Sequence, residues 1–151
     1  MKNSIGAQNV FKLDFNSSLI PAVVERIKET YGKAYSAFSG RPISLCKSLE
    51  RRGELRMKFE EPIYLWSVDT ENELAICQQS HPTVAITKDI STHGVGFSYD
   101  EDFETEHVIV EFDLFGEGTE YLLVEVRWST SLAAHSYVGG GLIKAIATVA
   151  H

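Results

Sequence analysis

Three arginines, Arg51, Arg52 and Arg56, lie within six residues of a chain whose formal net charge is −7. A guanidinium is always charged and carries several hydrogen-bond donors, so a local cluster of arginines can hold a small anion. A run of charges is equally typical of a solvated surface. The rest of the sequence has to decide between anion binding and mere solubility.

A second segment with binding potential is D-I-S-T-H-G, Asp89 to Gly94, where a β-rich run ends and turn residues begin. Taken alone, Asp-x-Ser at the end of a strand is ordinary turn chemistry. Two arginines four residues apart also occur often by chance. The two segments together, one before and one within a β-rich region, form a more specific pattern.

Other kinds of site are not indicated. No histidine stands at a ligand spacing or beside a cysteine, and the two cysteines, Cys46 and Cys77, are predicted to be buried or incidental thiols rather than a disulfide. No nucleophile elbow, P-loop or dinucleotide-binding glycine motif is present. The acidic run D-E-D-F-E-T-E-H is typical of solvated surface, and the glycines of V-G-G-G-L-I indicate a bulge or a tight corner in a strand. We therefore expect no metal, no cofactor and no enzymatic activity.

The charge is divided unevenly along the chain. Between Arg41 and Lys58, six cations oppose two carboxylates, a balance of +4, whereas from Phe59 onward three cations oppose sixteen carboxylates, a balance of −13. Such a body repels a long polyanion, so we expect no binding to polymeric DNA or RNA. A small anion at the arginine cluster remains compatible with this distribution.

The composition predicts one folded domain in 151 residues, with 44% hydrophobic and 23% charged residues. No secretory signal and no apolar run of the ~18 residues needed for a membrane span is visible, so a cytoplasmic location is expected. The chain is predicted to divide near Gly40, into an N-terminal extension (1–40) and a β domain with its arginine-rich lead-in (41–151).

An amphipathic helix is predicted in the N-terminal extension, because apolar residues recur at steps of four and three, at Leu19, Val23, Ile27, Tyr31, Tyr35 and Phe38. Ser17 or Ser18 can cap this helix, Pro21 suits its first turn, and Gly40 can end it. The helix is expected to pack on the following domain. A helix that forms a homodimer is the alternative.

Short runs rich in Val, Ile, Tyr and Phe follow Pro62, separated by turn residues. They predict strands at 62–68, 73–78, 83–90, 95–100, 107–115, 120–129 and 136–143. No helix long enough for a parallel crossover intervenes, so the fold class is expected to be mainly β, an antiparallel sheet closed into a small barrel. The final residues, Leu142 to His151, are compatible with either a strand or a short helix.

From Arg41 to Ile146 the chain resembles the PilZ family, cytoplasmic receptor domains for the bacterial second messenger cyclic di-GMP. The family pattern is RxxxR followed by (D/N)xSxxG, here R-G-E-L-R at Arg52 to Arg56 and the segment Asp89 to Gly94. Softer similarities are V-G-F after the second motif, V-R-W in a late strand, and a glycine before the last strand. The resemblance implies a six-stranded antiparallel split β-barrel. His93 and Leu142 depart from residues common in the family, although neither belongs to the defining pattern.

The resemblance also implies how a ligand is bound. Arg52 and Arg56 would fork onto the phosphates or the guanine O6 and N7 of cyclic di-GMP, and Asp89 would accept hydrogen bonds from a guanine edge. Ser91 would hold the turn or reach the ligand. Gly94 would let the backbone approach the base or supply a positive φ. His93 is a secondary candidate, with an exposed turn residue as its plain interpretation.

In domains of this family, an arginine just before RxxxR favours the binding of a mutually intercalated pair of ligands over a single one. The resemblance therefore implies that Arg51 favours such a pair. Binding is expected to order residues 41–58 and so to signal to a downstream protein. Two alternatives stay open, a degenerate PilZ module that only binds proteins and, less favoured, an unrelated small β-barrel enzyme or oligonucleotide binder. Oligomeric state is open as well, a homodimer included.

Overall fold

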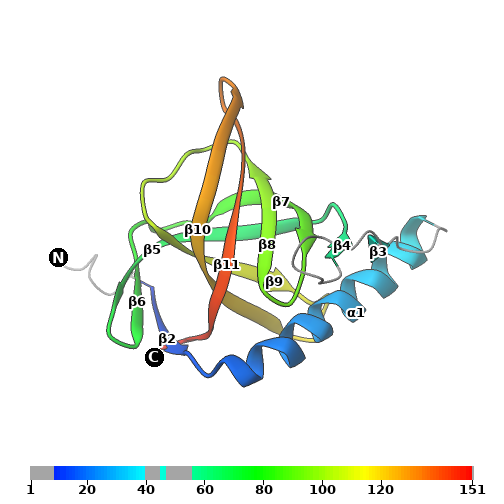
Figure 1. Ribbon diagram of the computed structural model, residues 1–151, viewed down its shortest axis with the longest axis horizontal. Helices are drawn as coiled ribbons and strands as arrows, with labels where there is room; N and C mark the ends of the chain where they lie inside the picture. The colour runs from blue at the N-terminus through cyan, green and yellow to red at the C-terminus, as the bar shows by residue number, and fades with distance from the viewer. Residues whose placement is uncertain (1–8, 40–44, 47–55, 151) are drawn as a thin grey trace.

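The computed structural model describes residues 9–39, 45–46 and 56–150, with side chains at 9–32 and 56–150. The protein is mainly β, with strands β2 to β11 in one antiparallel sheet and one long helix, as Figure 1 shows. The strands are β2 (Val10–Asp14), β3 (Leu45–Cys46), β4 (Arg56–Lys58), β5 (Pro62–Glu71), β6 (Leu74–Cys77), β7 (Thr83–Ile90), β8 (Gly94–Tyr99), β9 (His107–Asp113), β10 (Thr119–Ala133) and β11 (Ser136–Val149). The helical elements are η1 (Ser17–Leu19) and α1 (Ile20–Ser39).

Six of the strands pair in a ring, in which the last strand pairs again with the first. Strand β5 pairs with β7, β7 with β8, β8 with β11, β11 with β10, β10 with β9, and β9 again with β5. Strands β2 and β6 form a second connection between β11 and β5, and β4 and β3 extend the sheet from β7. The predicted strands are therefore present, and the ambiguous C-terminal segment is a strand as far as Val149.

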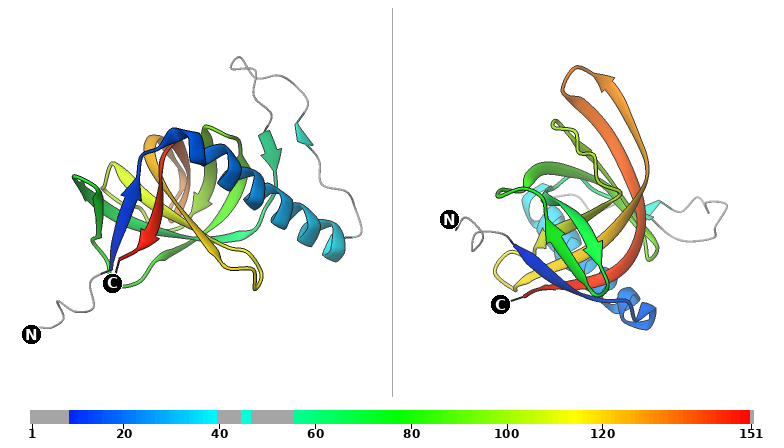
Figure 2. Two further views of the ribbon diagram at one scale, coloured as in Figure 1. Left: turned by 90° about the horizontal axis from the view of Figure 1, so that it is seen from below. Right: turned by 90° about the vertical axis from the view of Figure 1, so that its left-hand side faces the viewer.

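Strand β2 was not predicted from the sequence. Its residues V-F-K-L-D alternate, with Phe11 and Leu13 buried and Lys12 exposed, which is the pattern of a half-buried strand. It pairs with the end of β11, in the register that sets Ile146 opposite Asp14, and Figure 2 shows the two strands side by side. The N-terminal extension thus contributes to the same sheet as the rest of the chain.

Helix α1 packs on the sheet, which confirms the favoured interpretation of the amphipathic pattern. Ile27 and Tyr31 are buried in one core cluster, with the Tyr31 ring centroid 5.3 Å from that of Phe59 on the sheet side. The buried face also includes Val24, whereas Leu19 is 43% exposed. The predicted stripe was therefore wrong at its start.

The reason lies in the first turn. Residues Ser17–Leu19 form a 3₁₀ turn, whose three-residue period does not continue the α-helical stripe. Ser17 and Ser18, the predicted caps of the helix, lie within this 3₁₀ turn, which is itself capped by Asn16, whose side chain accepts the hydrogen bond from the backbone N–H of Ser18 at 3.1 Å. Within the described part of the chain, no helix is both long and apolar enough to cross a membrane.

Candidate functional site

The two sequence motifs meet where β4 pairs with the end of β7. The register sets Lys58 opposite Asp89, so Arg56 at the start of β4 reaches the Asp89 side chain although 33 positions separate them. Arg56 Nη1 donates to Asp89 Oδ1 at 3.0 Å. The two side chains are 13% and 26% exposed, so this ion pair is largely shielded from water but still reachable from outside.

Ser91 lies in the turn between β7 and β8 and is fully buried. Its Oγ accepts hydrogen bonds from the backbone N–H groups of Gly94, at 3.2 Å, and His93, at 3.4 Å. Its own N–H donates to the Gly94 carbonyl at 2.9 Å. Of the two roles expected for Ser91, the structure shows the one in which it holds the turn.

Gly94 is required for strand packing. Its φ is not positive, so the expectation that it supplies a positive φ is wrong. The residue pairs with Leu142 on β11, and a Cβ at this position would stand 2.8 Å from the Gly141 carbonyl oxygen. Only glycine therefore allows β8 and β11 to approach this closely.

A pocket of about 470 Å³ opens beside the ion pair. The predicted residues that line it are Arg56, Asp89 and Gly94, and the other lining residues are Val95, Gly96, Arg127, Trp128, Gly141 and Leu142. Trp128 is 49% exposed, so its indole is available at the pocket. Sequence reasoning gave Arg127 and Trp128 no binding role, although V-R-W belonged to the softer family similarities.

Glycines make room for the side chains at this pocket. A Cβ on Gly96, which pairs with Asp89, would stand 3.1 Å from Asp89 Oδ1. A Cβ on Gly140 would stand 3.1 Å from the ring atom Cζ2 of Trp128, its partner on β10. The register of β10 also shifts between Val126 and Trp128, so the irregularity lies on β10, opposite the glycine run in which a bulge or tight corner was predicted.

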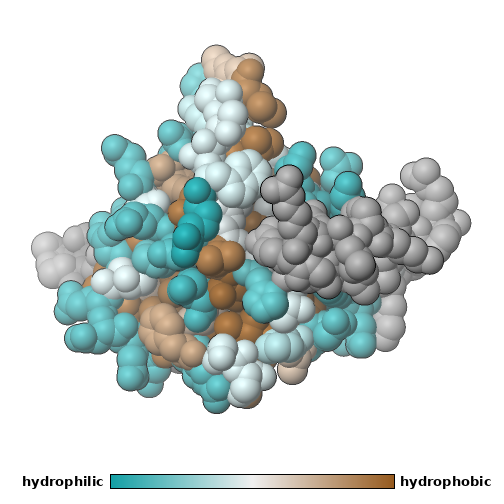
Figure 3. Space-filling view, viewed as in Figure 1, coloured by the Kyte–Doolittle hydropathy of each residue, from teal (hydrophilic) through white to brown (hydrophobic). Residues whose placement is uncertain are grey.

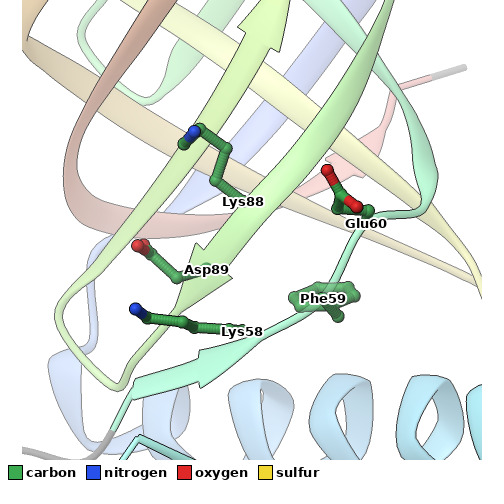
Figure 4. Close-up of a pocket in the computed structure, with 5 residues that line it drawn as sticks. All are labelled: Lys58, Phe59, Glu60, Lys88 and Asp89. Carbon is green, nitrogen blue, oxygen red and sulfur yellow. The ribbon is translucent and has the colours of Figure 1, made fainter. Parts of the chain in front are cut away.

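A second pocket of about 460 Å³ adjoins the first and shares Asp89 with it. Its other lining residues are Lys58, Phe59, Glu60 and Lys88. Figure 4 shows that the side chains of Lys58, Asp89 and Lys88 project in the same direction, with the carboxylate between the two ammonium groups. The two pockets together hold four cations against two carboxylates.

Two of these four pocket cations belong to the acidic part of the chain after Phe59, which contains only three cations in all. Lys88 lines one pocket and Arg127 the other. The third, Lys144, lies 4.0 Å from Glu125, whose carboxylate also bonds Arg127 at 2.9 Å. Two of the three cations after Phe59 thus line the pockets, which favours an anionic ligand there, although Glu125 partly offsets Arg127.

No family model, curated protein or solved structure matches this chain. The resemblance to PilZ domains therefore rests on the motif residues alone. Among those residues, Arg51 and Arg52 lie outside the described part of the chain, as does most of the segment 41–58. His93 is exposed in the turn, its carbonyl accepts from the Ile143 N–H at 2.8 Å, and it lines neither pocket. The described residues contain no cluster of three or more His, Cys, Asp or Glu side chains suited to a metal ion.

Proposed function

We propose that this protein is a cyclic di-GMP receptor of PilZ type, and that the ligand binds across the two pockets around Asp89. The observation that carries the proposal is the contact between the two motifs, Arg56 Nη1 to Asp89 Oδ1 at 3.0 Å, at the edge of an open pocket. The ring of pairings among β5, β7, β8, β11, β10 and β9 supports the six-stranded barrel that the family would require.

Each chemical group of cyclic di-GMP finds a suitable side chain here. The Arg56 guanidinium can fork onto a phosphate or onto guanine O6 and N7. Asp89 can accept hydrogen bonds from guanine N1–H and the exocyclic amine. The exposed indole of Trp128 offers a face on which a base can stack, and Arg127 adds a second guanidinium.

The ion pair also explains a preference for a nucleotide over a simple anion. Without ligand, Arg56 and Asp89 satisfy each other. An inorganic anion that draws Arg56 away leaves the Asp89 carboxylate without its cation, which is unfavourable in a partly buried position. A guanine nucleotide supplies an acceptor for Arg56 and donors for Asp89 at the same time, so both groups remain paired.

The space suits a ligand with two halves. Each pocket has the volume of a small-molecule site, and the two share Asp89. One guanylate half would lie beside Arg56 and Trp128, and the other beside Lys58 and Lys88. The intercalated pair implied by Arg51 would use the same space, and the titration stoichiometry distinguishes one ligand per site from two.

The response to ligand rests on the arginine-rich segment. Binding is proposed to bring Arg51 and Arg52 onto the nucleotide, so that residues 41–58 become the surface recognised by a downstream protein. Amide hydrogen exchange with and without ligand measures this directly. Residues 56–58 already pair with β7, so the gain in protection on binding is expected in residues 41–55. Unchanged exchange there would contradict the signalling part of the proposal while leaving the binding part intact.

The binding proposal is tested by calorimetric titration with cyclic di-GMP. Wild-type protein should bind, and both Arg56→Ala and Asp89→Ala should weaken binding roughly 10- to 100-fold, the loss expected for a hydrogen bond to a charged group. Lys12→Ala and Asp69→Ala, which remove exposed charges from β2 and β5, serve as matched controls and should bind as wild type does.

Two results would contradict the binding proposal. Absence of binding to the wild type would reject the ligand. Binding that survives both Arg56→Ala and Asp89→Ala would reject the site. Titration with inorganic phosphate provides the further comparison, since a simple anion should bind far more weakly than the dinucleotide if Asp89 has to be satisfied as well.

A further inference from the structure

The far end of β10 is an unpaired strand edge. Strand β9 covers β10 only from Thr119 to Glu125, and the Val126 N–H then donates to the Glu106 carbonyl at 2.8 Å. From residue 127 to 133, β10 has β11 on one side, and no strand of the described chain pairs with its other side. Figures 1 and 2 show the β10–β11 hairpin projecting beyond the rest of the sheet, and residues 127–135 are all exposed.

This edge lacks the usual protection against pairing with another chain. Natural edge strands carry charges or prolines, or are covered by other elements. The stretch from Trp128 to Ile143 is the longest in the sequence without Asp, Glu, Lys or Arg, and it contains no proline. Leu132 is 63% exposed near the tip of the hairpin, and Figure 3 shows the projecting tip coloured mainly pale to brown.

We propose that this edge pairs with the same edge of a second copy of the chain, which extends the two hairpins into one antiparallel sheet. A two-fold axis at Thr130 would set Ser129 opposite Ser131, and Trp128 opposite Leu132 of the partner. The sequence S-T-S is symmetric about Thr130, so the same pairs form twice. Opposed hydroxyl pairs and aromatic–aliphatic pairs both stabilise antiparallel strands.

The charge of the chain favours a second copy as the partner at the free edge of β10. Two copies of a chain with net charge −7 repel each other wherever their acidic bodies meet. Residues 128–143 of the hairpin carry no Asp, Glu, Lys or Arg, so contact along this edge brings no like-charged side chains of the strand together. A partner recognised through opposite charge would need charges on the edge itself, and residues 128–134 carry none.

Bulges limit the length of the pairing. The register of β10 against β11 shifts between Val126 and Trp128 and again between Ser131 and Ala133. Between the shifts, Trp128 to Ser131 pair without interruption with Gly140 to Tyr137. The new interface is therefore short, and the association should depend strongly on protein concentration.

Sedimentation equilibrium of the ligand-free protein over a wide concentration range tests the proposal. The wild type should pass from monomer to dimer, and Thr130→Lys should weaken the dimer by about tenfold or more, because two like charges would meet at the two-fold axis. Thr70→Lys is the matched control, since Thr70 is an exposed position on β5 paired with Ala75. It should leave the dimer unchanged, and circular dichroism verifies that both variants fold.

A crosslink tests the position of the axis. Thr130→Cys should form a disulfide-linked dimer under mild oxidation, because residues opposite each other across an antiparallel two-fold lie within disulfide reach. Thr70→Cys should not. A wild type that stays monomeric at all concentrations, or a dimer that Thr130→Lys leaves intact, would overturn the proposal. Thr130 lines neither ligand pocket, but Trp128 lines one of them and lies in the proposed interface, so cyclic di-GMP binding by Thr130→Lys is compared with that of the wild type at a concentration where both are monomeric.

Discussion

The contact between Arg56 and Asp89 can be measured as a coupling free energy. We consider four proteins: the wild type, Arg56→Ala, Asp89→Ala and the double variant. Each single change leaves a charged partner in a partly buried position, whereas the double change removes both charges. The free energy of unfolding should therefore fall by less in the double variant than the sum of the two single losses.

The geometry sets the size of this coupling. A hydrogen bond to a charged group is worth about 1.5–3 kcal/mol, and the partial exposure of Asp89, at 26%, places the expected coupling in the lower part of that range, about 1.5–2 kcal/mol. Urea unfolding followed by circular dichroism measures it, since the chain has the size at which small domains unfold in two states.

An exposed ion pair on β10 provides the control. Arg127 and Glu125 approach as closely, at 2.9 Å, but their side chains are 56% and 32% exposed. Exposed ion pairs contribute little, so their coupling should be about 0.5 kcal/mol or less. If the Arg56–Asp89 coupling does not exceed that of this exposed pair, the contact does not organise the site, and the reasoning about nucleotide preference fails with it.

Two further predictions concern stability. Burial raises the pKa of Cys77 from its ordinary 9.0 to about 11, so the unfolded chain loses the thiol proton first and stability should fall as pH rises above 9. Urea unfolding under reducing conditions should show the wild type losing about 1.4 kcal/mol more than Cys77→Ala between pH 8 and pH 10, and equal losses would contradict this assignment. Gly94→Ala should cost about 1–3 kcal/mol, because the new Cβ meets a backbone oxygen at 2.8 Å. Gly96→Ala should cost less, because the nearest atom belongs to the movable Asp89 side chain, and a larger loss than for Gly94→Ala would show that this side chain cannot move.

The sequence predicted those parts of the fold that depend on local patterns. Runs of β-branched and aromatic residues predicted most of the strands, and the recurrence of apolar residues predicted the helix and its packing on the sheet. Strand β2 was missed because its alternation covers only five residues, Val10–Asp14, and its stability comes from pairing with β11, which is distant in sequence. The face of α1 was misjudged at Leu19, because a 3₁₀ turn precedes the helix.

The site was predictable only in part, for a related reason. Motif spacing identified Arg56 and Asp89, but only the pairing of β4 with β7 brings them together. Arg127 and Trp128 could not be assigned to the pocket, because their position depends on a bulge in β10 opposite the glycines of β11. Gly94 was expected to serve a ligand, whereas the structure shows that the neighbouring strand also requires it.

The proposed function requires an acidic protein to bind an anion, and the distribution of charge bears on that requirement. The pockets around Asp89 hold Arg56, Lys58, Lys88 and Arg127 against only one other carboxylate, Glu60. Salt screens charges beyond about 8–10 Å, so a small anion inside the pockets interacts mainly with these four cations and with the adjacent carboxylates of Asp89, Glu60 and Glu125. A polymer that extends past the pockets also meets the carboxylates that dominate the chain after Phe59. If the proposed function holds, these charges would favour a compact dinucleotide over polymeric DNA or RNA.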